Sequence, residues 1–382
     1  MKVPERLLLG PGPSPVSPRV MQALGSPIVS HLDPAMMALL DDLRVRVGWA
    51  FGAQPDAFSF AVSGTGTAGM ETAIANVTRP GARALVAVSG YFGDRLAQIL
   101  ERYGAEVARV EVEWGRACDP EQIARALKAR GADIVAMVHG ETSTGVVNPV
   151  KEIVALAQQH GAISIVDAVT TLGGVPVRAA DWGADVCYSC TQKGLGAPSG
   201  LSPVTFSRRI LEARAPSRSF YLDVGLLEDY WVRRKYHHTL SAPLIYALHA
   251  ALVAAEEEGL DARWARHRRH HLALAAGLEI LGMSLLPPAD ERLWTLNAVR
   301  VPDGVDEAGV RRRLLDEFSI EIGAGLGPLA GRIWRVGLMG AGSTLSNVLL
   351  LLTALEHVLR GSGYRTESAG AAVAAAEAAV SA

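Results

Sequence analysis

The 382-residue sequence contains only three cysteines, few for its length and odd in number. This count argues against the disulfide framework that holds many small secreted proteins together. Cys187 and Cys190 do have the CxxC spacing of redox and zinc sites. They fall in a stretch, 184–191, that reads as a β-strand, where a separation of three points two side chains to opposite faces. We therefore predict packed core cysteines and no metal site.

The sequence also lacks an excess of charge of one sign and any long uncharged apolar run. Its formal net charge is −2, from 37 basic and 39 acidic residues that are interspersed along the chain. Neither a basic stripe for nucleic acid nor a polybasic segment for a membrane surface is present. The apolar stretch near the start is too short for a signal peptide. We expect a cytoplasmic protein that binds neither nucleic acid nor membrane.

What the sequence does contain is the pattern of a two-domain α/β protein with a large core, since 49% of its residues are apolar. From about residue 36 to 257, short apolar runs alternate with helical periodicity, which predicts a mostly parallel sheet between helices. A smaller α/β domain is expected to follow. We divide the chain into an N-terminal arm (1–15), a large domain (16–258), a small C-terminal domain (259–362) and an Ala-rich tail (363–382).

Two charged residues lie where this pattern predicts the edge of the sheet. The apolar run 162–166 ends at Asp167, and Lys193 follows a second apolar stretch after a short crossover. Because neighbouring parallel strands end at the same edge of a sheet, we expect both charges there. The pair suits pyridoxal 5′-phosphate. A lysine amine condenses with its aldehyde, and a carboxylate keeps its pyridine nitrogen protonated so that the ring acts as an electron sink.

A glycine-rich turn at 64–69, between an apolar run and an apolar helix, satisfies the GxGxxG pattern of dinucleotide-binding dehydrogenases. That class needs an acid at the end of the next strand for the ribose hydroxyl. Here the next strand ends at 88–90 without an acid. The turn therefore predicts an anion site for a single phosphate, built from backbone N–H groups, a helix N-terminus and the hydroxyls of Thr65 and Thr67.

With these features in place, the sequence resembles the class V, fold-type I pyridoxal-phosphate aminotransferases. Within them it is similar to the alanine/serine–glyoxylate group and to its ureidoglycine–glyoxylate branch. The resemblance runs from about residue 7 to 360. It depends on motifs in matching order and spacing: GPGPSPV at 10–16, SGTGTAGME at 63–71, HGETSTG at 139–145, SIVDAV at 164–169, TQKGLGAPSG at 191–200, YHHT at 236–239 and GPLAGRIWRVGLMG at 327–340.

The resemblance implies a role for each motif around the cofactor ring. Lys193 would be the catalytic lysine, and Asp167 would pair with the pyridine nitrogen. Phe92 would stack on the ring, where many relatives have tryptophan, and Thr142 would hydrogen-bond near the phenolic oxygen. A class V desulfurase would instead need a cysteine near the C-terminal region, and no cysteine follows Cys190.

Two groups of residues would hold the cofactor phosphate. The resemblance implies that Thr65, Gly66, Thr67 and Gln192 bind it from one subunit. Tyr236 and Thr239 would reach it from the neighbouring subunit. This arrangement implies a homodimer with shared active sites.

The substrate residues imply a transaminase that moves an amino group from alanine or serine to glyoxylate, giving glycine and a 2-oxo acid. Arg335 would hold the substrate carboxylate in a fork, and Gly12 would lie in an arm that closes over it. The alternative donor is (S)-ureidoglycine, whose branch has asparagine in place of Tyr236 and glutamine in place of His31. An amide pair suits a ureido group. Segments such as 227–231 resemble that branch, but specificity is set by groups that touch the substrate, so we favour alanine or serine.

Two sets of histidines resemble metal ligands. His237 and His238 are adjacent, a poor chelating geometry, so we expect packing at a subunit contact. His267, His270 and His271 have i, i+3, i+4 spacing, but three neighbouring arginines add positive charge. We therefore expect a solvated helix face there.

Overall fold

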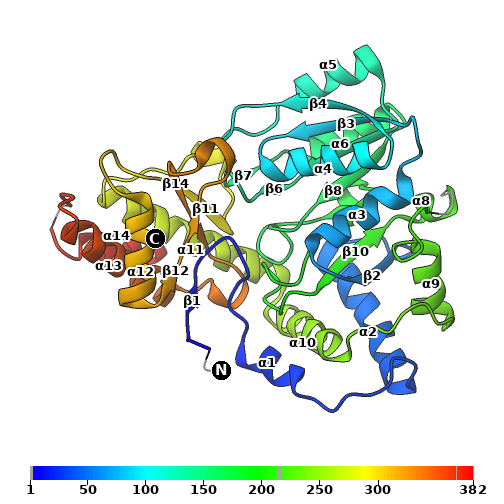
Figure 1. Ribbon diagram of the computed structural model, residues 1–382, viewed down its shortest axis with the longest axis horizontal. Coiled ribbons are helices and arrows are strands. Elements are labelled where there is room, and N and C mark those ends of the chain that lie inside the picture. Colours follow the sequence, from blue (N-terminus) through cyan, green and yellow to red (C-terminus); the bar gives the residue numbers. More distant parts are fainter. Residues whose placement is uncertain (1–2, 214–216, 367, 382) are drawn as a thin grey trace.

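The computed structural model describes residues 3–213, 217–366 and 368–381. The predicted arm and tail include positions 1, 2, 367 and 382, which lie outside the described residues. Figure 1 shows a larger part, coloured blue to green, beside a smaller part, coloured yellow to red. Each part has its own hydrophobic core. The boundaries at residues 15, 258 and 362 stay a prediction.

A seven-stranded sheet forms the centre of the larger part, in the order β2-β10-β9-β8-β5-β3-β4. Its strands are β2 (Phe58–Ser63), β3 (Arg83–Val88), β4 (Glu106–Glu111), β5 (Ile134–Val138), β8 (Ile163–Asp167), β9 (Val186–Tyr188) and β10 (Leu201–Phe206). All pairs from β9 to β4 are parallel, and β10 is antiparallel to both of its neighbours. The predicted mostly parallel sheet is confirmed. Its central strands are apolar runs because helices cover both of their faces.

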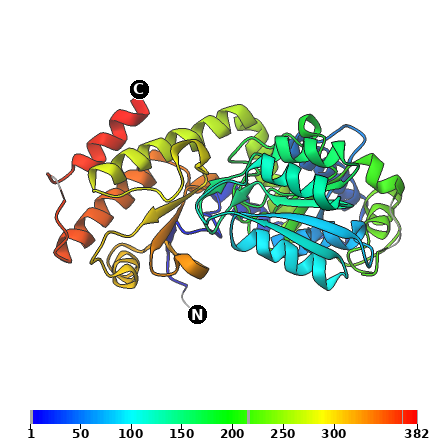
Figure 2. The same ribbon diagram turned by 90° about the horizontal axis from the view of Figure 1, so that it is seen from above.

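Helices flank this sheet on both sides (Figures 1 and 2). They are α1 (Pro18–Leu24), α2 (Pro34–Phe51), α3 (Gly66–Val77), α4 (Tyr91–Arg102), α5 (Pro120–Arg130), α6 (Val150–Gln159), α7 (Ala179–Trp182), α8 (Arg208–Ala213), α9 (Val224–Arg233) and α10 (Ala242–Glu258). Helix α2 shows how the sequence sets such bounds. The Asp33 carboxylate accepts the Ala35 N–H, Pro34 occupies the first helical position, and Gly52 ends the helix in the left-handed conformation. Among the described residues, no helix is long and apolar enough to cross a membrane.

The smaller part contains a three-stranded antiparallel sheet, in the order β11-β14-β13, packed against long helices. Its elements are α11 (Leu260–Ile280), β11 (Leu296–Arg300), α12 (Glu307–Phe318), β12 (Ile320–Glu321), β13 (Gly323–Ala324), β14 (Ile333–Gly337), α13 (Leu345–Gly361) and α14 (Ala371–Ser381). The N-terminal arm joins this part, because β1 (Leu7–Leu8) pairs with β12. The Ala-rich tail forms α14, which packs along α11 (Figure 2).

Candidate active site

A cavity of about 170 Å³ lies where the parallel strands of the large sheet end. Asp167 is the last residue of β8, and Lys193 follows β9 on a turn. The strand predicted over 184–191 is shorter than expected, since β9 (Val186–Tyr188) stops at Tyr188. Eight predicted site residues line the cavity: Thr65, Gly66, Thr67, Phe92, Thr142, Asp167, Gln192 and Lys193.

The Lys193 amine is buried at this cavity, with 9% of the residue exposed. Its Nζ donates to the Pro11 carbonyl of the N-terminal arm. No acidic side chain of the described residues lies within ion-pair distance of it. Burial lowers the pKa of the amine, which favours the uncharged, nucleophilic form. The Ser14 hydroxyl donates to the Lys193 carbonyl at 2.7 Å and so fixes the turn.

Asp167 faces the same cavity with its carboxylate held at both oxygens. Oδ1 accepts the Val169 N–H at 2.7 Å, and Oδ2 accepts the Tyr188 hydroxyl at 2.7 Å. Burial raises the pKa of Asp167 to about 6, and these two hydrogen bonds oppose that rise. The group is therefore mostly ionised at neutral pH. It can accept a hydrogen bond from a protonated ring nitrogen in the cavity.

The other end of the cavity suits an anion. Helix α3 begins there, and its N-cap residue Thr65 makes no side-chain capping bond, so its hydroxyl is available to a ligand. The first N–H groups of a helix have no acceptor within the helix and favour negative charge. Gln192 lines the cavity as well, and its side-chain amide N–H groups are the donors that it can offer to an anion. A Cβ at Gly66 would lie 3.0 Å from Val169 Cγ2, so the tight turn requires glycine.

Phe92 and Arg95 form one side of the cavity, on the first turns of α4. The Arg95 guanidinium carbon lies 4.9 Å from the centre of the Phe92 ring, and Nη1 donates to the Thr67 hydroxyl at 3.3 Å. Sequence reasoning did not select Arg95. Its i, i+3 spacing from Phe92 on a predicted helix is the signal that places both on one face.

Glu141 holds the start of α4 in place from beneath the cavity. Its fully buried carboxylate accepts the Phe92 and Gly93 N–H groups at 3.1 Å and the Ser143 hydroxyl at 2.6 Å. Burial raises the pKa of this carboxyl. Glu141 belongs to the HGETSTG motif at 139–145, but no role was predicted for it from the sequence. A Cβ at Gly90 would lie 2.6 Å from Glu141 Cγ, so glycine admits the carboxylate here.

Arg335 reaches the site from β14 of the smaller part. It is buried, its Nε donates to the Ala324 carbonyl at 2.6 Å, and Nη1 lies 3.5 Å from the Thr142 carbonyl. Within the described residues it makes no ion pair. Burial lowers the pKa of the guanidinium, but an arginine keeps its charge in proteins. The result is a buried cation with donors to spare for a carboxylate.

Gly12 lies in the arm against the lysine. A Cβ on Gly12 would lie 2.7 Å from Lys193 Cδ, and its φ of +111° also favours glycine.

The Thr142 hydroxyl bonds to the Thr170 hydroxyl in a short contact. The contact that the resemblance implies for Thr142 stays a prediction.

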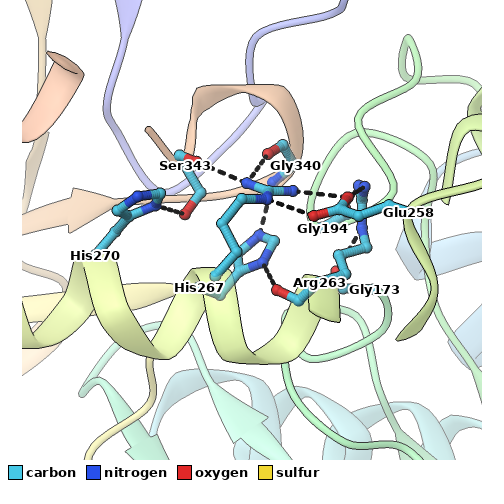
Figure 3. A network of polar contacts seen from close by, with 9 residues as sticks. Gly173, Gly194, Glu258, Arg263, His267, His270, Gly340 and Ser343 are labelled. Atoms are coloured by element: carbon cyan, nitrogen blue, oxygen red, sulfur yellow. Dashed lines mark hydrogen bonds and ion pairs between the residues drawn. The ribbon is translucent and has the colours of Figure 1, made fainter. Parts of the chain in front are cut away.

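The α11 histidines are not on a solvated face, so that expectation is wrong. His267, His270 and His271 are all buried. His267 Nδ1 pairs with the Arg263 carbonyl at 2.7 Å, while its Nε2 accepts the Gly340 N–H at 3.1 Å (Figure 3). The latter contact requires an unprotonated Nε2, and burial lowers the pKa of His267 to about 3. Arg268 and Arg269 are exposed, whereas Arg266, together with Arg263 one turn earlier, bonds to backbone and to a carboxylate inside the protein.

These arginines connect the two parts of the molecule (Figure 3). Arg263 donates to the carbonyls of Gly173 and Gly194 at 2.8 Å, and Gly194 directly follows Lys193. Arg266 donates to the Ser343 carbonyl at 2.6 Å, in the segment that follows β14. Both arginines pair with Glu258. The network thus ties the Lys193 turn to the strand that carries Arg335.

Five predicted residues are not among those that line this cavity: Gly12 and Arg335, which lie beside it, and His31, Tyr236 and Thr239. Tyr236 is 62% exposed, and Thr239 is exposed as well. The His31 and Tyr236 rings lie together on this surface, with centroids 5.3 Å apart. His238 Nε2 lies 3.1 Å from the Ser63 hydroxyl, just before the glycine turn. The proposed donor-selecting pair is therefore brought together, but outside the protomer's own cavity.

The cysteine prediction is confirmed, since Cys118, Cys187 and Cys190 are buried free thiols. Burial raises the pKa of Cys187 well above its usual value and that of Cys190 to about 12, as expected of unreactive core thiols.

Fold and site together define an α/β enzyme with an amine, an acid and an anion site in one cavity. Residues 8–333 match the family Aminotransferase class-V. The chain is 38% identical to the (S)-ureidoglycine–glyoxylate transaminase of Bacillus subtilis (strain 168), over 93% of this chain and 91% of that protein. It is 35% identical to the alanine–glyoxylate aminotransferase of Drosophila melanogaster, over 96% and 95%.

Two solved structures support the same family. A crystal structure of ureidoglycine–glyoxylate aminotransferase from Bacillus subtilis matches with a TM-score of 0.97 at 39% identity, covering 100% of both chains. A crystal structure of alanine–glyoxylate aminotransferase from Nostoc sp. matches with a TM-score of 0.92 at 46% identity, covering 94% of this chain and 97% of that one. The chain belongs to the class V aminotransferases. It is a pyridoxal phosphate-dependent transaminase of fold type I, as the sequence predicted.

Proposed function

We propose that this cavity holds pyridoxal 5′-phosphate and that the enzyme transfers an amino group from alanine or serine to glyoxylate. One observation carries the proposal. A buried lysine amine and a buried carboxylate share one cavity, and a buried guanidinium without an ion-pair partner lies beside it. The Thr65 hydroxyl and the free N-terminus of α3 fit the cofactor phosphate. When bound, the cofactor supplies an electron sink for the bonds at the substrate Cα.

Each residue has one task in this proposal. Lys193 takes the proton from the Cα of the amino donor and returns it during the second half of the cycle. Asp167 holds a positive charge at the pyridine nitrogen, and Phe92 packs on the ring. Arg335 binds the substrate carboxylate and so orients the Cα–H bond, while the arm around Gly12 excludes water from the lysine.

We also propose a cytoplasmic homodimer. Several large side chains near Tyr236 are exposed in the protomer, among them Phe220 (74%) and Tyr221 (43%), and His237 contacts both rings. Such a surface is costly to leave in water and is typical of a subunit contact. A partner bound here brings Tyr236 and Thr239 toward the second cavity. The cytoplasmic location rests on the balanced charge of the chain, with 37 basic and 39 acidic residues.

The choice of donor depends on His31 and Tyr236. Relatives of both donor classes have similar identity to this chain, so overall similarity does not choose between them. The phenol of Tyr236 fills space, and together with an imidazole it offers no matched amide pair for a ureido tail. Unpaired polar groups in a closed site cost about 1–3 kcal/mol each, which corresponds to discrimination of ~10-fold or more. (S)-Ureidoglycine remains the alternative donor.

The test is a comparison of kcat/KM for alanine, serine and freshly generated ureidoglycine, each with glyoxylate as the acceptor. We expect alanine or serine to be preferred. The double variant His31→Gln/Tyr236→Asn, assayed at saturating cofactor because Tyr236 is also expected to reach the cofactor phosphate, should shift preference toward ureidoglycine. A wild-type preference for ureidoglycine would refute the pocket argument.

A further inference from the structure

A tyrosine that no sequence motif singles out lies next to the proposed ring-pairing acid. Strands β8 and β9 are parallel neighbours, and their register makes Asp167 and Tyr188 Cα partners. The Ala168 N–H bonds to the Tyr188 carbonyl at 2.8 Å, which fixes the two chains at this point. Both residues are almost completely buried. The contact between them is thus built into the sheet.

The side chains meet in one defined hydrogen bond. The Tyr188 hydroxyl donates to Asp167 Oδ2 at 2.7 Å, while the Val169 N–H occupies Oδ1. Burial raises the pKa of Tyr188 well above its usual value, so the hydroxyl remains a donor. Two further charged groups face Asp167: Glu141, which raises the pKa of Asp167, and Lys193, which lowers it.

Helix α3, which carries the anion site, packs closely against Tyr188 at Gly69. A Cβ at Gly69 of α3 would lie 3.3 Å from Tyr188 Cβ and 2.0 Å from the Ser202 hydroxyl. Only a glycine lets α3 approach β9 and β10 this closely. Because the Tyr188 side chain is also fully buried, its ring has little freedom to rotate, and its hydroxyl is presented to Asp167 in advance.

We propose that Tyr188 is a positioning residue whose hydroxyl orients the Asp167 carboxylate and keeps it ionised toward the pyridine nitrogen of the cofactor. The proposal rests on the proposed function, because it gives Asp167 its partner. Tyr188 is not among the residues that line the cavity, and it acts through Asp167, which is. Without the hydroxyl, the buried carboxylate loses one of its two donors and becomes easier to protonate.

The perturbation is Tyr188→Phe, which removes one oxygen and leaves the ring. Hydrogen bonds to charged groups contribute about 1.5–3 kcal/mol, so we expect the cofactor dissociation constant to rise roughly 10-fold or more. We also expect kcat to fall with little change in KM for the amino donor. The pH midpoint of the bound cofactor's absorbance should shift by about one unit.

The chain offers a matched control. The Tyr103 hydroxyl donates to Glu71 at 3.0 Å, also a tyrosine–carboxylate bond, but neither residue lines the cavity. Tyr103→Phe should therefore leave cofactor affinity, absorbance and kcat unchanged. Circular dichroism and thermal melting of both variants report folding. Loss of folded protein for Tyr188→Phe alone would make the hydroxyl a structural group and overturn the proposal.

A double-mutant cycle separates this proposal from the proposed function. Asp167→Asn tests the acid, and Tyr188→Phe in that background tests whether the tyrosine acts through it. We expect the second change to have no further effect on cofactor affinity. Equal effects in both backgrounds, or no effect in either, would overturn the positioning role. If Asp167→Asn itself leaves affinity and absorbance unchanged, the role proposed for Asp167 fails instead.

Discussion

The buried guanidinium of Arg335 gives the sharpest test of how substrates are held. Its fork has an acceptor at Nε and only a long contact at Nη1, so at least one donor face is free for a carboxylate. A bidentate pair consists of two charge-assisted hydrogen bonds, each about 1.5–3 kcal/mol. Arg335→Met removes both and is expected to lower kcat/KM by about 10²–10⁴-fold. Arg335→Lys keeps a charge but loses the fork, so a loss of ~10–100-fold is expected.

The assay measures both half-reactions, because the amino donor and glyoxylate both have a carboxylate. Losses should appear for each substrate, while cofactor content per subunit stays at the wild-type level. Arg332→Met is the matched control, since this exposed arginine lies just before β14 and outside the cavity. Values of kcat/KM within threefold of wild type for Arg335→Met, with intact cofactor loading, would refute the assignment.

Three further predictions follow from buried groups. Borohydride reduction should fix the cofactor on Lys193, as read by peptide mapping, and Lys193→Ala should lower turnover at least ~10³-fold; an adduct on another lysine contradicts this. Glu141→Gln places an amide donor against the two N–H groups that begin α4, so cofactor affinity, followed by fluorescence, should fall ~10-fold, and unchanged affinity would show that this carboxylate is dispensable. Burial lowers the pKa of His139 and His271 to about 4 and that of His267 to about 3. The contribution of these neutral histidines to the free energy of unfolding is therefore fully present above pH ~6.5, and it is lost as the pH falls below that value. These three should together lower the free energy of unfolding by ~4 kcal/mol at pH 5.5, and denaturant midpoints equal at pH 7.5 and 5.5 would contradict this.

Residues at the ends of parallel strands were predictable because a strand end is visible in sequence. Asp167 follows an apolar run of the kind that both faces of a buried sheet require, and the structure places it at the last position of β8. Lys193 was predicted at the same edge but lies on a turn beyond β9. The antiparallel strand β10 was not predicted, since a buried run of apolar residues has the same pattern in either direction.

The α11 histidines show where charge patterning fails. Arg268 and Arg269, between the histidines, are exposed, but the three histidines lie on the buried face of the same helix. Arg263 and Arg266 end on backbone carbonyls and on Glu258, which satisfies their donors inside the protein. The partners are loop carbonyls far away in sequence. No periodicity within α11 reports them, so the burial of His267 depended on tertiary contacts alone.

The roles of Tyr188 and Glu141 were not predicted from the sequence, for a related reason. A tyrosine inside an apolar strand reads as core, and only the register with β8 reveals that its hydroxyl meets a carboxylate. Glu141 reads as one polar residue in a polar loop, whereas its four donors come from α4 and from Ser143. Both residues act by holding another group, and such roles depend on pairs of segments that a single stretch of sequence does not contain.

His31 and Tyr236, the pair proposed to select the amino donor, depend in the same way on contacts that no single stretch of sequence contains, here between subunits. His31 and Tyr236 come from distant parts of the chain, yet their rings contact each other on an exposed surface and not in the cavity of their own protomer. The Tyr230 hydroxyl donates to the His31 carbonyl at 3.0 Å, which fixes that loop before any partner binds. A preformed pair at the rim of one subunit suits recognition of a substrate held mainly by the other. In the proposed homodimer, donor choice is then a property of the dimer, while Lys193, Asp167 and Arg335 belong to one chain.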